Sequence, residues 1–192
     1  MRVATEGIMY PKDAKASLLP YYKSLKDSDY SSVIEIPHGA WFRSKCKEEL
    51  DKAFSTLKRA KPSYVFVLGP LHKGRVSYDD PALVYAPCDG SLSGSDWEIK
   101  LSVPSSLRPY VCFSDDICSE EQSLEIAAPY LSLFFEDVPV CHLLASIDGD
   151  VVKKIASIIK KDFPKALVFI SNNKETCCAR LWKEAFADGN RT

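Results

Sequence analysis

The chain has 192 residues and a formal net charge of −1, and hydrophobic residues make up 46% of it. Charged residues account for 27%, so the composition is typical of a folded globular protein and excludes a disordered chain. The nearly balanced charge offers no basic surface, so neither a nucleic acid nor a membrane is predicted as a partner. The length suits a single domain over residues 1–192.

The sequence predicts a soluble, cytoplasmic protein. Glu6 lies where a secretory signal peptide would need an apolar core, and no apolar run approaches the roughly 20 residues of a membrane helix. The cysteines number seven, and no two of them form a Cys-x-x-Cys pair. This pattern supports neither a disulfide framework nor a structural zinc site, so we expect reduced thiols.

The first half of the chain predicts a strand–helix–strand unit. Residues 15–25 predict a helix that Pro20 interrupts or restarts. A β-branched run predicts a strand over 32–36, helical spacing of apolar residues predicts a helix over 45–59, and a second apolar run predicts a strand over 64–68. This order predicts two parallel strands joined by a right-handed crossover.

Each of these two strands stops at a proline or glycine and then presents a histidine, His38 or His72. Ligands in α/β sheets gather at the carboxyl ends of the strands, and neutral imidazole is a common metal ligand. We therefore expect the two histidines to face one pocket and to share a metal ion or a substrate. The alternative, that each is a hydrogen-bonded structural residue, stays open.

The second half is irregular at first and then alternates again. Short apolar pieces over 79–97 predict strands and a hairpin, and residues 120–135 predict a helix that kinks or ends at Pro129. The last predicted elements alternate between strand and helix: strand 138–144, helix 150–161, strand 166–170 and helix 177–187. The whole order predicts an α/β domain, a three-layer sandwich with a mostly parallel central sheet.

Short motifs, taken in order, resemble those of a known family. Residues 37–41, Pro-His-Gly-Ala-Trp, are similar to a Pro-His-Ala-Gly-Tyr motif, and residues 68–72 match Leu-Gly-Pro-x-His. Residues 118–125 are similar to His-Ser-x-Glu-His-Ser-Leu-Glu. The chain thus resembles the Memo-like family (mediator of cell motility), related in fold to the class III extradiol ring-cleaving dioxygenases. Members of that family are longer by several tens of residues.

The resemblance implies a metal pocket built on His38 and His72. In the dioxygenase relatives, two histidines and a carboxylate hold a non-haem iron whose open positions bind substrate and oxygen. Here the two histidines of the third motif are replaced by Cys118 and Gln122. Because an amide cannot titrate, Gln122 cannot serve as a general acid or base.

Further groups have two interpretations each. Glu121 and Glu125 lie on one face of the predicted helix and serve either the pocket or the start of that helix. Cys177 and Cys178 are soft donors in the region where a third metal ligand would come, or else structural thiols. His142 lies inside a predicted strand, where a hydrogen-bonded core histidine is the simpler interpretation.

Three functions fit this pattern. The favoured one is a divergent Memo-like protein that keeps a pocket of His38, His72, Gln122, Cys118 and Glu121, lacks efficient catalysis, and binds a small ligand or a protein partner. The alternatives are a metal-dependent oxidoreductase that uses non-haem iron or copper, and a protein that binds copper or iron. In the favoured case iron, copper or zinc binds weakly, and none is expected in the protein as isolated.

Overall fold

The computed structural model describes residues 2–3, 11–26, 29, 31–39, 44–71, 84–119, 121, 123–145, 149–172 and 177–187. The strands within these ranges are β1 (Arg2–Val3), β2 (Val33–Pro37), β3 (Val65–Pro70), β4 (Val84–Ala86), β5 (Gly90–Ser93), β6 (Glu98–Leu101), β7 (Val111–Phe113), β8 (Val140–Ala145) and β9 (Leu167–Asn172). The helices are α1 (Ala14–Ser24), α2 (Ser44–Ser55), α3 (Asp115–Ser119), α4 (Ala128–Phe134), α5 (Gly149–Asp162) and α6 (Cys177–Ala187), with a 3₁₀ turn at Arg108–Tyr110.

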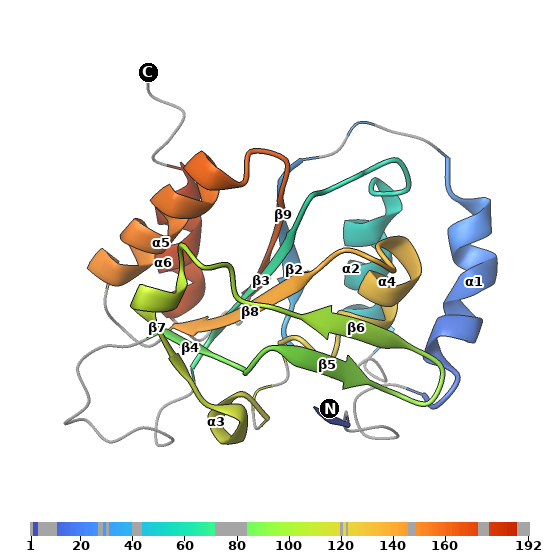
Figure 1. The fold of residues 1–192 in the computed structure, drawn as a ribbon. Helices are drawn as coiled ribbons and strands as arrows, with labels where there is room; N and C mark the ends of the chain where they lie inside the picture. The colour runs from blue at the N-terminus through green and yellow to red at the C-terminus, as the bar shows by residue number, and fades with distance from the viewer. Residues whose placement is uncertain are drawn as a thin grey trace.

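The strands form one mostly parallel sheet, which confirms the predicted α/β class. Its order is β1-β5-β6-β8-β3-β9-β2, with β4 paired to β8 and to β7. Among the described strands, the antiparallel pairs are β4 with β8 and β5 with β6, a hairpin whose second strand lies beyond the predicted range of 79–97. Helices α5 and α6 cover one face of the sheet, and α1, α2 and α4 lie on the other (Figure 1).

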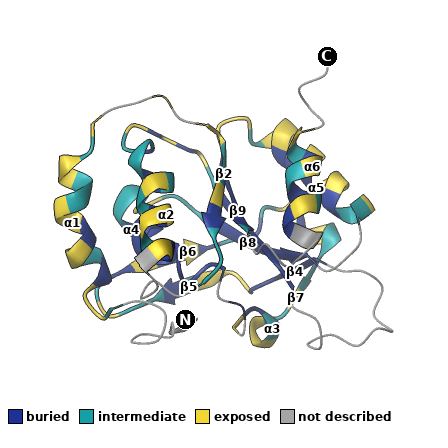
Figure 2. Cartoon of the chain, turned by 180° about the vertical axis from the view of Figure 1, so that it is seen from behind, coloured by how far each residue is buried: buried dark blue, intermediate teal, exposed yellow. Residues whose placement is uncertain are grey.

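The central strand β3 is buried along its whole length, because both faces of the sheet are apolar and are covered by helices. Successive side chains of a strand point to opposite faces. Val67 and Phe169 therefore pack toward α2 and α4, whereas Phe66 and Ile170 pack toward α5 and α6, against the fully buried Trp182. Figure 2 shows the buried strands between two layers of helices whose outer surfaces are exposed.

The helices α1, α2 and α4 are fastened to one another by Asp51. Its carboxylate accepts a hydrogen bond of 2.7 Å from the Tyr130 hydroxyl and pairs with Lys47 Nζ at 2.6 Å. The Tyr21 hydroxyl donates to the backbone carbonyl of Asp51. Phe54, three residues after Asp51 in α2, stacks on Tyr130 with ring centroids 4.7 Å apart. Asp51 thus links α2 to α4 through its carboxylate and to α1 through its backbone carbonyl.

Two predicted helices differ from the structure. Pro20 lies inside α1, which runs from Ala14 to Ser24. The N-terminus of this helix is held by the carboxylate of Asp96, which accepts hydrogen bonds from the backbone amides of Lys15 and Ala16. The helix predicted over 120–135 is confined to Ala128–Phe134. Proline is tolerated in the first turn of a helix, where its missing N–H has no partner to lose, so Pro129 begins α4 instead of ending a helix.

The predicted pairing of the first two long strands also needs a correction. β2 and β3 are parallel, but they are not neighbours, because β9 lies between them and pairs with both. Their carboxyl ends still lie at one edge of the sheet. No described helix is long and apolar enough to cross a membrane.

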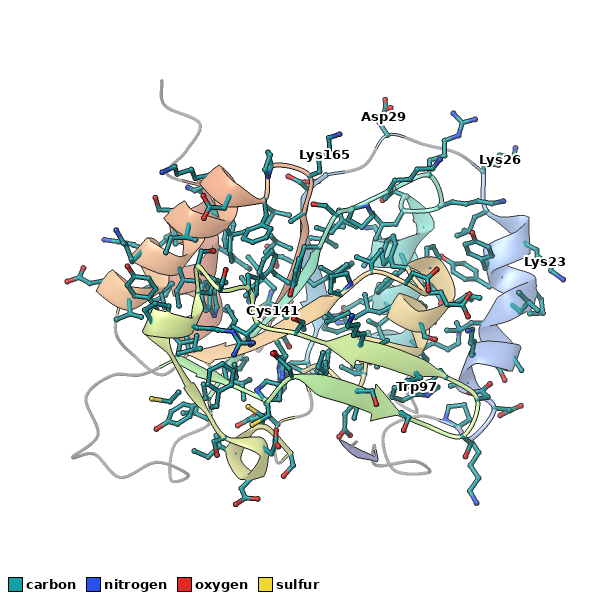
Figure 3. The ribbon with its side chains drawn as sticks, in the orientation of Figure 1. Lys23, Lys26, Asp29, Trp97, Cys141 and Lys165 are labelled. Atoms are coloured by element: carbon teal, nitrogen blue, oxygen red, sulfur yellow. The ribbon has the colours of Figure 1, made fainter. Side chains whose placement is uncertain are left out.

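We expect Asp51→Ala to lower the free energy of unfolding by about 1.5–3 kcal/mol, the range for hydrogen bonds to a charged group. The substitution removes the acceptor of Tyr130 and the ion-pair partner of Lys47. Urea denaturation followed by tryptophan fluorescence measures the change. Asp29→Ala, at an exposed carboxylate that points away from the fold (Figure 3), is the control and should change stability by less than about 0.5 kcal/mol. Equal effects of the two substitutions would contradict the role given to Asp51.

We also expect stability to fall at alkaline pH. Burial raises the pKa of Tyr21 and of Tyr64 from 10.0 to about 12, and it raises the pKa of Tyr130 and of the Cys141 thiol above their ordinary values. Because these groups stay neutral longer in the folded chain, their stabilising effect is complete below the unfolded pKa values and is lost as the pH rises through the folded ones. The urea midpoint should decline from about pH 9–10 upward. A constant midpoint from pH 8 to 11.5 would contradict this.

Candidate functional site

His38 lies where predicted, just beyond the carboxyl end of β2. Its Nδ1 is 2.9 Å from the hydroxyl oxygen of Ser171, which is fully buried in β9. The register of the two strands explains this contact, since Ser171 lies opposite Ile36 and Asn172 lies opposite Pro37. The contact joins neighbouring strands at the sheet edge where ligands gather in such folds.

His72 and Gln122 lie outside the described residues, so their predicted contact with His38 stays a prediction. β3 ends at Pro70, at the same edge of the sheet as β2 and two strands away from it. With strands about 4.8 Å apart, backbones two strands apart are separated by about 10 Å. The carboxyl ends of β2 and β3 therefore lie at one edge of the sheet, about 10 Å apart.

Cys118 and Glu121 are both buried, but in settings that the sequence did not indicate. Cys118, in α3, packs in a small apolar cluster with Leu71, Tyr85 and Leu144. Its burial against Leu71 places it near the carboxyl end of β3. Glu121 is 2% exposed and lies outside any helix. We predicted that Glu121 and Glu125 share one face of a helix. This prediction is wrong, because residues 123–127 form turns.

A second serine–histidine pair is buried beside β3. His142 Nε2 lies 2.8 Å from the Ser123 hydroxyl oxygen, and both residues are about fully buried. His142 lies opposite Val67 in the register of β8 with β3. Ser123 also packs closely against the backbone of β3 at Gly69. A Cβ added to Gly69 would lie only 2.4 Å from the Ser123 Oγ, so a larger residue would overlap it. His142 is thus a hydrogen-bonded core histidine, as the simpler interpretation held.

A groove of about 800 Å³ opens beside His38, between β2 and α2. We call it the α2 groove; its lining includes His38, Gly39, Lys45, Cys46, Glu49 and Lys52. The Cys46 thiol donates a hydrogen bond of 3.2 Å to the carbonyl of Gly39, the residue after His38. A thiol therefore lies close to the histidine loop, which the sequence analysis missed.

The described residues do not complete a metal site. They contain no group of three histidine, cysteine, aspartate or glutamate side chains placed to hold a metal ion. The side chains of Cys177 and Cys178, interpreted either as soft metal donors or as structural thiols, lie outside the description, although both residues begin α6. The described lining of the groove contains an imidazole (His38), a thiol (Cys46) and two carboxylates (Glu35 and Glu49), but no three of these are grouped closely enough to hold a metal.

Sequence reasoning missed Ser123 and Ser171, which hold the two histidines. Each serine contacts a histidine distant in the sequence, and no local pattern reports such a contact. A weak signal existed at Ser171, a polar residue at the end of an otherwise apolar strand.

Comparison of the chain with models of known protein families finds no match, and comparison with curated proteins finds none either. The resemblance to the Memo-like family therefore stays a prediction that depends on the motifs alone.

We expect Gly69→Ala to lower the free energy of unfolding by about 1–3 kcal/mol, because the added methyl overlaps Ser123 Oγ and Cβ. Urea denaturation measures this. Gly90→Ala is the matched control: no atom lies within 4 Å of the new methyl, and the change should stay below about 1 kcal/mol. Adding Ser123→Ala to Gly69→Ala should relieve only part of the loss, since the serine Cβ lies 2.9 Å from the new methyl. A Gly69→Ala protein as stable as the parent would show that Ser123 does not press on β3.

Proposed function

We propose that this chain is a divergent Memo-like protein, related in fold to the class III extradiol ring-cleaving dioxygenases, that binds a small ligand or a protein partner through its histidine pocket and lacks efficient catalysis. Its thiols suit the reducing cytoplasm, since none of Cys46, Cys88, Cys112, Cys118 and Cys141 is in a disulfide. The mostly parallel α/β sheet is the architecture that the proposal requires.

The contact between His38 and Ser171 is the observation that carries the proposal. The serine hydroxyl can donate to or accept from Nδ1, so it orients the imidazole in either tautomer. A histidine that is held in this way at the carboxyl edge of a parallel sheet, beside a groove, is prepared for binding.

The environment of the substituted motif positions supports binding over catalysis. Cys118 packs among apolar side chains, which is how a structural thiol packs. Gln122, by its chemistry, cannot exchange protons near neutral pH. An acid–base step would therefore have to use a group other than the two that replace the family's histidines.

One observation favours the alternatives, a metal-dependent oxidoreductase or a copper- or iron-binding protein. Histidines that bind metals usually hydrogen-bond a partner through their other ring nitrogen, as His38 does with Ser171. Non-haem iron would supply oxygen activation, and Cys46 is a soft donor suited to copper. The described residues fall short of the three ligands that such a metal usually takes.

Metal analysis of protein purified without chelators tests the proposal. We expect iron, copper and zinc together well below one equivalent, because two imidazoles supply no charge to offset a divalent cation. Catechols should not be cleaved. His38→Ala and His72→Ala should leave the small metal content unchanged, with Ser132→Ala, at a buried serine of α4, as the control. Stoichiometric metal that both histidine variants lose and the control keeps would overturn the proposal in favour of the metal-dependent alternatives.

A further inference from the structure

The strand β2 is an edge of the sheet. Among the described strands it pairs with β9 alone, and it ends the strand order. Figure 2 shows β2 between α2 on one side and α6 on the other, with no described helix or strand drawn across it. The α2 groove lies on one face of this edge. A second groove of about 590 Å³, which we call the α6 groove, lies on the other and shares Val33 and Glu35 with it.

The backbone of β2 can accept a further strand over a short length. The carbonyl of Ser32 accepts a hydrogen bond of 2.8 Å from the Val168 amide, so in a parallel ladder Val33 and Glu35 direct their backbone groups away from β9. The Ser31 hydroxyl donates a hydrogen bond of 2.9 Å to the Val33 carbonyl and accepts one of 3.3 Å from the Val33 amide. A partner backbone could replace this hydroxyl. Pro37 has no N–H and sets the end of the ladder.

The α6 groove suits apolar side chains. Phe163, Val168 and Phe186 line it, together with the aliphatic side chain of Ile159. Its lysines are already engaged: Lys183 Nζ pairs with Glu35 at 2.7 Å, and Lys160 Nζ donates to the Ala185 carbonyl at 2.9 Å. Side chains that enter from this face would therefore contact hydrocarbon.

The α2 groove suits acidic side chains. Lys45 and Lys52 are exposed on α2 and line the groove with the exposed Glu49 between them. The two lysines are seven residues apart, which is about two helical turns and about 10 Å along the axis. Both therefore lie on the same side of α2, the side that lines the groove beside β2. Glu35, the other carboxylate of this lining, pairs with Lys183, which leaves Lys45, Lys52 and Glu49 with a net positive charge.

We propose that the edge of β2 binds an extended segment of a partner protein in which acidic and apolar residues alternate. Alternate side chains of a strand point to opposite faces, so the acidic ones would lie toward Lys45 and Lys52 and the apolar ones in the α6 groove. Backbone hydrogen bonds to Val33 and Glu35 would extend the sheet, the mode known as strand addition. The backbone pairing does not depend on His38, although the acidic side chains would lie in the α2 groove that His38 also lines.

Fluorescence anisotropy with a labelled peptide, Glu-Val-Glu-Val-Glu-Val, tests the proposal on the full chain. We expect saturable binding that weakens at least tenfold in the Lys45→Glu/Lys52→Glu protein and strengthens in Glu49→Gln. Lys23→Glu, on the exposed side of α1 (Figure 3), is the matched charge control and should bind like the parent. A peptide with lysine in place of each glutamate should not bind. Equal binding of both peptides, or an equal loss in the Lys23 variant, would overturn the proposal.

N-methylation of the peptide separates strand addition from simple charge attraction. Methyl groups on the amides of the valines, or on those of the glutamates, block alternate sides of the peptide backbone. We expect one of the two methylated peptides to lose binding and the other to keep it, because only one side faces β2. Unchanged binding of both would overturn the proposal. So would a dimer in sedimentation analysis that Glu35→Pro dissolves, since a second copy would then occupy the edge.

Discussion

Burial of β3 on both of its faces is the constraint on which the rest of this structure depends. The strand lies between β8 and β9, and each of its residues is buried, so helices must cover the sheet on both sides. Apolar side chains fill the space between the sheet and the helices on each face. Other segments that approach β3 must therefore pack closely against it. The approach of Ser123 to Gly69 is one such contact. Few polar side chains are buried in the described part of the chain: Glu121, Ser123, Glu125, Ser132, His142 and Ser171.

The two serine–histidine pairs share one kind of hydrogen bond but differ in their surroundings. Both place a hydroxyl about 2.8–2.9 Å from one ring nitrogen, on the α2 side of the sheet. His142 is sealed in the core, where its pair with Ser123 fixes the turns after α3 against β3 and β8. His38 is only partly buried and lines a groove. The greater exposure of His38 makes it the candidate for ligand binding.

The sequence predicted the elements whose apolar patterns are local. The strands that became β2, β3, β8 and β9 lie within one or two residues of the predicted ranges, and α6 has the predicted bounds. Strand order could not be predicted, because the insertion of β9 between β2 and β3 depends on a crossover late in the chain. Pro129 misled for a physical reason: a proline that breaks a helix and one that begins it look alike without knowledge of the preceding turn. The hydroxyl partners of the histidines are likewise long-range contacts.

The edge at β2 combines protection with access. A free edge invites pairing with any strand, and natural sheets limit this with charges, prolines and short edges. Glu35 places a charge on the edge, Pro37 ends the ladder, and the Ser31 hydroxyl covers the backbone of Val33. None of these devices closes the grooves on the two faces, which remain lined by hydrocarbon on one side and by lysines on the other. Pairing through the short ladder alone would be weak, so a bound strand must also fill both grooves. The same features that reject an arbitrary strand would thus select one whose side chains alternate in the matching way.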